Sequence, residues 1–314
     1  MITINNINNS SDLLFSIPVH EKQDIVNNTI ENIFNFNPNC KIILHINKNF
    51  TSFNKEKSKY SNLYINKTDL EYIPHEDLLI YHVSNFKYCI ENNVQFKYFI
   101  FSASNELFIK KGAIHYINIK KNGLQIVEYD KEIDWHNFKK NIDEEDVILH
   151  LFDILKKDTL YGGQTEGQFY EKEIFNKICE YYLEITKNNS IKIKFEAEEI
   201  IPSIVFKSLN LSHGDPINLQ NYTNNIDFSV DYINNLIKGI YIEDKPIKNQ
   251  LTSPHINKTS ENIYSIKRVD RTFNKIRNYL SKKGLILNNS DYYYNINYYS
   301  NSSSLIIKNK DEIQ

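Results

Sequence analysis

The chain has 314 residues, with 37 Lys and Arg against 39 Asp and Glu and a formal net charge of −2. This balance argues against a dedicated nucleic-acid-binding protein, whose affinity comes largely from a basic face that meets phosphates. Hydrophobic residues make up 41% of the chain and aromatic residues 13%, so the composition is that of a globular protein rather than a disordered one.

In the N-terminal part of the chain, short apolar runs alternate with a segment whose apolar residues recur at helical spacing. Residues 13–19 (LLFSIPV) and 41–47 (KIILHIN) predict strands, and residues 24–36 between them predict a helix that Pro38 ends. A strand, a helix and a strand in such close succession form a βαβ unit. This unit predicts a parallel sheet with a right-handed crossover.

The same alternation continues along the chain and predicts an α/β fold, with a mostly parallel central sheet flanked by helices. Further strands are expected at 60–65, 96–102 and 125–128, a loop at 103–107, and helices at 78–92, 172–186, 200–209, 229–241 and 271–282. Residues 142–156 fit a helix or a loop, and the Asn-, Ser- and Tyr-rich tail from Asn288 fits an edge hairpin or a mobile arm. We predict a polar lead at 1–12, one domain at 13–285 and a tail at 286–314.

Cysteine use and hydropathy indicate the compartment. Cys40, Cys89 and Cys179 lie far apart without C-x-x-C spacing, which favours neither a disulfide framework nor a structural zinc site. No apolar run approaches the roughly 20 residues of a membrane span, and the polar lead is unlike a signal peptide. We therefore expect buried or incidental thiols in a cytoplasmic protein that makes at most peripheral contact with the inner face of the cytoplasmic membrane.

A polar segment (SASNE) follows the apolar run of the strand predicted at 96–102. Ligands of open α/β sheets bind beyond the carboxyl ends of the strands, so Ser104, Asn105 and Glu106 are candidates to contact one. An ordinary polar loop is the alternative interpretation. A second polar segment, 161–167 (YGGQTEG), holds three of the eight glycines, which indicates a backbone that needs special dihedral angles or a close approach to its neighbours.

Three acidic residues cluster at Glu196, Glu198 and Glu199 (FEAEEIIPS). Adjacent like charges raise one another's pKa, which suits a general base that works near neutral pH. The alternative is a group of acidic residues at a helix N-terminus, where the helix dipole stabilises them. Both interpretations can hold together.

The basic residues are also unevenly placed. All three arginines lie between Arg268 and Arg277, directly after Lys267 (IKRVDR). Because the planar guanidinium group matches phosphate oxygens, Lys267, Arg268 and Arg271 suggest a site for a diphosphate. A solvated basic helix face is the alternative.

The sequence lacks G-x-G-x-x-G, the P-loop, G-x-S-x-G and H-E-x-x-H. It also lacks an Asp-x-Asp after a predicted strand. Metal-dependent glycosyltransferases use that pair of carboxylates to hold Mn²⁺ or Mg²⁺ on the donor diphosphate. A protein that handled a sugar nucleotide without this pair would neutralise the leaving diphosphate with its own cations, so no metal site and no cofactor are expected.

The order of these segments resembles that of the core-two/I-branching N-acetylglucosaminyltransferase and xylosyltransferase family, glycosyltransferase family 14, and especially of its bacterial members. Residues 96–106 (FKYFIFSASNE) resemble one family segment, from which they depart at Asn105 and Glu106 and by lacking a proline. Residues 163–169 (GQTEGQF) resemble a segment on the acceptor side of the family's site.

Two later segments complete the resemblance. Residues 197–204 (AEEIIPSI) resemble the family segment that carries the catalytic base, and the base then falls on Glu199. Glu198 is its nearest rival, because a one-residue slip in the alignment exchanges the two. Residues 253–255 (SPH) with Lys267 and Arg268 resemble the region whose basic residues hold the diphosphate, and Arg271 is a further candidate there.

The resemblance implies a GT-A fold and an inverting, metal-independent glycosyltransferase. Its donor is expected to be a nucleotide sugar, UDP-linked, bound beyond the strands that end near Val19 and Asn47. The expected nucleotide contacts are Pro18, Val19, His20 and Asn47, and the expected sugar or acceptor contacts are Ser104, Asn105, Glu106, Gly163, Gln164 and Glu166.

The acceptor is expected to be a hydroxyl of a glycan or glycolipid, in the synthesis of a bacterial surface polysaccharide or lipooligosaccharide. Two other functions stay open at this point. One is a non-catalytic glycan-binding protein on a degenerate transferase fold. The other is a transferase that moves a different group, such as a phosphoryl derivative or sulfate, to a surface polysaccharide.

Overall fold

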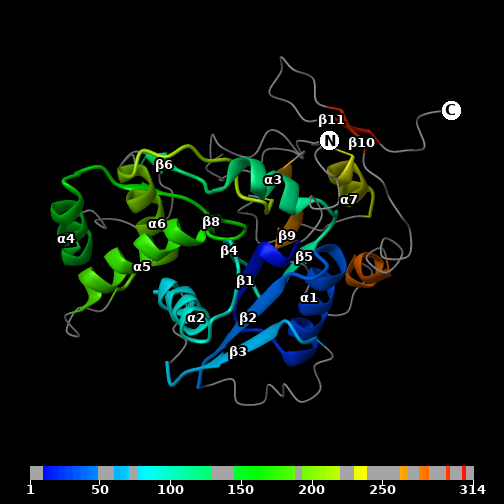
Figure 1. Ribbon diagram of the computed structural model, residues 1–314, viewed down its shortest axis with the longest axis horizontal. Helices are drawn as coiled ribbons and strands as arrows, with labels where there is room; N and C mark the ends of the chain where they lie inside the picture. The colour runs from blue at the N-terminus through cyan, green and yellow to red at the C-terminus, as the bar shows by residue number, and fades with distance from the viewer. Residues whose placement is uncertain are drawn as a thin grey trace, which may run out of the picture.

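Five strands form the central sheet, in the order β3-β2-β1-β4-β8 (Figure 1). They are β1 (Leu13–Pro18), β2 (Lys41–Ile46), β3 (Leu63–Lys67), β4 (Tyr98–Phe101) and β8 (Phe169–Glu171). The first four are parallel to one another, and β8 runs antiparallel to β4. The computed structural model describes residues 10–48, 60–70, 77–128, 145–187, 193–219, 230–238, 262–267, 276–282, 295–297 and 306–308.

The strand order reverses at β1. The chain moves from β1 to β2 and β3 on one side, and β4 then returns to the other side of β1. Leu14 of β1 lies opposite Lys41 of β2 on one side and Phe99 of β4 on the other. The carboxyl ends of β1 and β4 therefore form a topological switch point, the place where open α/β sheets bind their ligands.

Helices cover both faces of this sheet because its strands are apolar on both sides. Successive residues of a strand point to opposite faces, so Phe15 packs with α1 (Gln23–Phe36), whereas Leu14 packs with α2 (Leu79–Glu91). The cluster around Phe15 also takes in α3 (Ala113–Lys120). The cluster around Leu14 takes in α4 (Asp146–Leu155), α5 (Lys172–Thr186) and α6 (Ala197–Ser208), which lie together at the left of Figure 1.

A third apolar cluster forms beside the end of β4. Strand β5 (Glu106–Phe108) pairs antiparallel with β9 (Ser265–Lys267), and Leu107 and Ile266 pack with α7 (Val230–Ile237) and the helix at 276–282. This cluster joins residues near the middle of the chain to residues near its C-terminal end. It thereby fixes Lys267 beside the carboxyl end of the sheet.

Two small antiparallel pairs complete the strands of the described residues. They are β6 (Val127–Glu128) with β7 (Tyr161–Gly162), and β10 (Asn295–Asn297) with β11 (Ile306–Lys308). A 3₁₀ turn at Ser10–Asp12 precedes β1. The tail thus contains a paired hairpin, but its strands form a sheet of their own rather than an edge of the central sheet.

The predicted α/β class and the mostly parallel sheet are confirmed, and several element predictions are corrected. The loop predicted at 103–107 is wrong in its last residues, because β5 begins at Glu106 and pairs with β9. The strand predicted at 60–65 begins only at Leu63, and the strand predicted at 125–128 shrinks to its last two residues. The short antiparallel strand β8 has no counterpart among the predictions.

The three cysteines are free and buried, as expected. Burial raises the pKa of each thiol, to about 12 for Cys89. None of the helices in the described part of the chain combines the length and the apolar character that crossing a bilayer requires.

Candidate functional site

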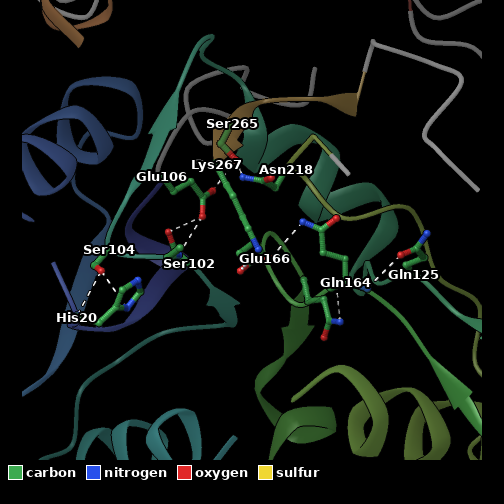
Figure 2. Close-up of polar contacts among 12 residues, drawn as sticks. His20, Ser102, Ser104, Glu106, Gln125, Gln164, Glu166, Asn218, Ser265 and Lys267 are labelled. Atoms are coloured by element: carbon green, nitrogen blue, oxygen red, sulfur yellow. Dashed lines mark hydrogen bonds and ion pairs between the residues drawn. The ribbon is translucent and has the colours of Figure 1, made fainter. Parts of the chain in front are cut away.

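Residues that follow β1 and β4 meet at the switch point. His20 lies just beyond β1, and its Nδ1 is 3.2 Å from the Oγ of Ser104, just beyond β4 (Figure 2). The Asn47 amide, beyond β2, donates a hydrogen bond to the carbonyl oxygen of Val19 at 3.3 Å. Pro18, the last residue of β1, leads into this group. The four residues predicted to contact a nucleotide thus lie together at the carboxyl edge of the sheet, next to Ser104.

Glu106 is buried in a hydrogen-bond network at the same edge. Its carboxylate accepts hydrogen bonds from Ser265 Oγ at 2.5 Å, from Ser102 Oγ at 2.9 Å and from the Ala103 amide at 3.1 Å (Figure 2). Burial raises the pKa of Glu106 above its usual value, although these hydrogen bonds oppose the rise. Asn218 supports the network by donating to Ser265 Oγ at 3.1 Å. Glu106 therefore joins the end of β4 to β9.

Lys267 lies on β9 opposite Glu106 in the register of the β5–β9 pair. Its ammonium group forms an ion pair with Glu166, in the loop between β7 and β8 (Figure 2). Burial alone would raise the pKa of Glu166, but the charge and the hydrogen bond of Lys267 outweigh that effect and bring it below the usual value. The pair thus places one cation and one ionised carboxylate side by side at the switch point.

The glycine-containing loop lies directly beside the end of β4. The Gly167 amide donates to the Phe101 carbonyl at 2.9 Å, and Gly167 has a φ of +77°, which a residue with a side chain rarely adopts. Gln164 Nε2 donates to Glu166 at 3.2 Å. The left-handed backbone explains the glycine at position 167, one of the three in this segment.

Two buried polar atoms of the loop have no hydrogen-bond partner among the described residues. They are Oε1 of Gln164 and Oγ1 of Thr165, whose side chains are 2% and 8% exposed. Buried polar atoms are nearly always paired. Thr165 directly precedes Glu166 and the Gln164 amide bonds to it, so a ligand hydroxyl or amide that reached the Glu166–Lys267 pair could bond to these atoms.

The two candidates for the catalytic base have different surroundings. The Glu198 carboxylate is buried and accepts the backbone amide of Leu78 at 3.2 Å. Burial, together with the charge of Glu199, holds the pKa of Glu198 well above its usual value. Glu199 is half-buried, and its carbonyl oxygen accepts the amide of Gly163 at 2.8 Å. Glu199 therefore adjoins the glycine-containing loop, whereas the Glu198 side chain faces the start of α2.

Both acidic residues lie in the first turn of α6, which begins at Ala197. This position matches the alternative interpretation of the acidic cluster, since carboxylates are stabilised at a helix N-terminus.

Of the predicted basic cluster, Arg268 and Arg271 lie outside the described residues. Arg277 is fully buried, and its guanidinium group donates to the side-chain oxygens of Asn28, at 2.9 Å, and Asn105. Arg277 therefore holds the Asn105 loop against α1 rather than facing solvent. No motif in the sequence indicated this role of Arg277, and none indicated Ser265 or Asn218.

Two further histidines belong to the core. His82 Nδ1 lies 2.8 Å from Ser16 Oγ, and burial lowers the pKa of His82 to about 3. His45 Nε2 lies 2.8 Å from Thr68 Oγ1, and burial lowers the pKa of His45 to about 4. Both rings are therefore neutral near neutral pH. Among the residues that the structure describes, no three or more His, Cys, Asp or Glu side chains are grouped so that they could hold a metal ion.

Comparisons with known proteins support a likeness of fold only. No protein-family model matches the chain, and no curated protein matches it. The chain is similar to the crystal structure of the apo-form glycosyltransferase GlyE of Streptococcus pneumoniae TIGR4, with a TM-score of 0.41 and 11% identity over 88% of this chain. It covers 62% of that chain. We therefore base the function on the geometry of the site.

Proposed function

We propose that the chain is a glycosyltransferase that binds a nucleotide sugar at the switch point of its sheet and transfers the sugar to a glycan hydroxyl. One observation carries the proposal. Polar side chains from segments far apart in the sequence converge at the carboxyl ends of β1 and β4, namely His20, Ser104, Gln164, Glu166 and Lys267 (Figure 2). Open α/β sheets bind nucleotides at such a place. The proposal includes a GT-A fold for this chain.

The donor is a UDP-linked sugar in this proposal. His20 and Asn47 contact the base or the ribose beyond β1 and β2. The unpartnered oxygens of Gln164 and Thr165 bond to hydroxyls of the transferred sugar. Lys267 stabilises the diphosphate, which competes with Glu166 for the ammonium group.

The transfer step inverts the anomeric carbon. An acceptor hydroxyl oxygen attacks the anomeric carbon. At the same time the bond between that carbon and the diphosphate oxygen breaks, and the diphosphate leaves with the electron pair. Glu199 takes the hydroxyl proton. Glu199 suits this role better than Glu198, because Glu198 is buried against Leu78 and its raised pKa favours the protonated form. Lys267, with Arg268 and Arg271, stabilises the leaving diphosphate without a metal ion.

A glycan-binding protein without catalysis is the second candidate. The Glu166–Lys267 ion pair favours it, because the carboxylate already neutralises a cation that a leaving diphosphate would need. Glu106 also favours the glycan-binding protein, since its carboxylate already accepts hydrogen bonds from Ser102 and Ser265. Such a protein would bind saccharides and ignore nucleotides.

The experiment measures UDP binding by calorimetry and UDP release from a panel of UDP-sugars with glycan acceptors, in excess EDTA. The wild-type protein should bind UDP and stay active. Glu199→Gln should lower turnover by about 10²–10⁴-fold and leave the Kd for UDP unchanged. Glu91→Gln, on the exposed end of α2, is the matched control and should change neither.

The role of Lys267 needs a variant that does not leave a buried carboxylate alone. Glu166→Gln/Lys267→Met removes both charges of the pair and should weaken UDP binding, whereas Glu166→Gln by itself should not. Full activity of Glu199→Gln contradicts its assignment as the base. Loss of activity in EDTA contradicts metal independence. Failure to bind UDP, GDP or CMP contradicts the transferase and supports the glycan-binding protein.

A further inference from the structure

A cavity lies between the segment that follows α4, β7 and the C-terminal half of α6. Its volume is about 450 Å³, within the range of small-ligand sites. We call it the α6 pocket; its polar lining includes Lys157, Thr159, Tyr161, Lys207, Ser208 and Asn210. Nothing in the proposed transfer step uses these residues.

The α6 pocket carries an excess of positive charge. Lys157 and Lys207 line it together with one acidic residue, Asp158, whose carboxylate accepts a hydrogen bond from Thr159 Oγ1 at 3.2 Å. Within the described part of the chain, neither lysine forms an ion pair with a carboxylate. Lys207 Nζ instead lies 5.5 Å from the centre of the Tyr161 ring, which holds the ammonium group at the pocket.

The rest of the lining suits a saccharide. The Asn210 amide can bond to sugar hydroxyls. The hydroxyl oxygens of Thr159 and Ser208 can accept from them, while their protons are donated to Asp158 and to the Val205 carbonyl. Buried Ile204 supplies an apolar wall. Small-ligand sites combine such a wall with a few polar groups that fix the orientation of the ligand. With two unpaired ammonium groups at the same place, the favoured ligand is a sugar that carries an anionic group.

One residue of the α6 pocket, Lys207, lies on the same face of α6 as the proposed base. Glu199, Ser203 and Lys207 are spaced four residues apart, so they lie on one face of α6. This face meets the segment around β7, because the Gly163 amide donates to the Glu199 carbonyl and Ser203 Oγ donates to the Gln125 carbonyl at 3.3 Å. Lys207 lies about 12 Å beyond Glu199 along the helix, at about 1.5 Å per residue.

We propose that the α6 pocket binds a saccharide bearing a carboxylate or a phosphate. This saccharide is a unit of the acceptor glycan, held two helical turns from the hydroxyl that Glu199 deprotonates. The assignment of the ligand to the acceptor rests on the proposed function. The binding of an anionic saccharide rests on the pocket alone.

The test titrates the full chain with free saccharides and follows binding by calorimetry. The probes are N-acetylneuraminic acid for the carboxylate, glucose 6-phosphate for the phosphate and lactose as the neutral reference. At least one anionic probe should bind more tightly than lactose, and its binding should become weaker as salt is added. Lys157→Met/Lys207→Met should weaken that binding by about tenfold or more, whereas Lys177→Met, exposed on α5, should not change it.

The outcomes separate the two proposals. Binding of lactose as tight as that of both anions overturns the inference, and so does binding that Lys157→Met/Lys207→Met leaves unchanged or a failure of every probe to bind. UDP binding, measured in parallel, should be the same in this double variant and the wild type. A protein that binds an anionic probe through the two lysines but never binds UDP contradicts the proposed transferase and leaves the α6 pocket standing.

Discussion

Glu166 and Lys267 form an ion pair that joins the glycine-containing loop to strand β9. Their side chains are only 17% and 14% exposed. The pair therefore lies mostly out of water, where each charge depends on the other for its stability. Three kinds of variant test what the pair and its neighbours contribute to the fold.

Loss of Lys267 alone should be much more harmful than loss of both charges. Lys267→Met leaves Glu166 as a mostly buried carboxylate without its counter-ion. We expect a loss of about 2 kcal/mol in the free energy of unfolding, below the roughly 3–5 kcal/mol for a fully buried pair because both groups keep some contact with water. Glu166→Gln/Lys267→Met should recover most of it. Urea unfolding at pH 7 measures both.

The contribution of the pair should also depend on pH. The pKa of folded Glu166 lies below its usual value of 4.5, so its stabilisation is present above pH 4.5 and is lost as the pH falls through the folded pKa. The stability advantage of the wild type over Glu166→Gln should therefore shrink below pH 4.5. The exposed pair Glu184–Lys187 is the control, since exposed ion pairs contribute little. An advantage that stays constant to pH 3 contradicts the assignment.

The position of this site could be predicted from the first part of the chain, and its internal contacts could not. The apolar runs at 13–19 and 41–47 predicted the strands correctly, and ligand sites of parallel sheets follow strand ends. His20 and Asn47 lie beyond the ends of these strands, as predicted, and their contact with a nucleotide stays a prediction. The pairing of Glu106 with Lys267 joins segments far apart in the sequence, and no local pattern marks it.

The same limit explains the misassigned loop. Residues 103–107 are polar and short, so nothing in them indicates a strand until β9 is present to pair with β5. Arg277 was likewise grouped with a basic cluster because of its place in the sequence, whereas the fold buries it against Asn28 and Asn105. The acidic cluster shows the opposite case. Its place at a helix N-terminus was weighed correctly, because the attraction of carboxylates to the helix dipole is a local property.

Glu198 should destabilise the protein increasingly as the pH rises. Its folded pKa lies well above the usual 4.5, because it is buried and Glu199 is close. A folded protein that binds a proton more tightly than the unfolded chain loses stability as the pH climbs from the unfolded toward the folded pKa. Glu198→Gln removes the charge and keeps an oxygen for the Leu78 amide. We expect it to be at least as stable as the wild type at pH 5 and progressively more stable up to pH 8.

Urea unfolding across this pH range measures the effect of Glu198→Gln. Glu91→Gln provides the control, since Glu91 is exposed at the end of α2. A Glu198→Gln variant that is less stable than the wild type at every pH would show that the ionised carboxylate stabilises the junction of α2 and α6. It would also return Glu198 to consideration as the base.

Gly163 should not tolerate even a methyl group. A Cβ at Gly163 would overlap the backbone carbonyl of Gln125, with its carbon atom at 2.7 Å, and backbone atoms cannot move aside as a flexible side chain can. Gly163→Ala should therefore displace the loop from Glu199, whose carbonyl accepts the Gly163 amide. We expect a loss of about 3 kcal/mol in unfolding free energy together with weaker UDP binding.

Gly112→Ala is the matched control, because its φ of +100° strains the backbone while the nearest atom to a new Cβ is 3.8 Å away. It should lose only about 1 kcal/mol and bind UDP as the wild type does. Equal stability of the two variants would mean that close packing against Gln125 does not determine the position of this loop.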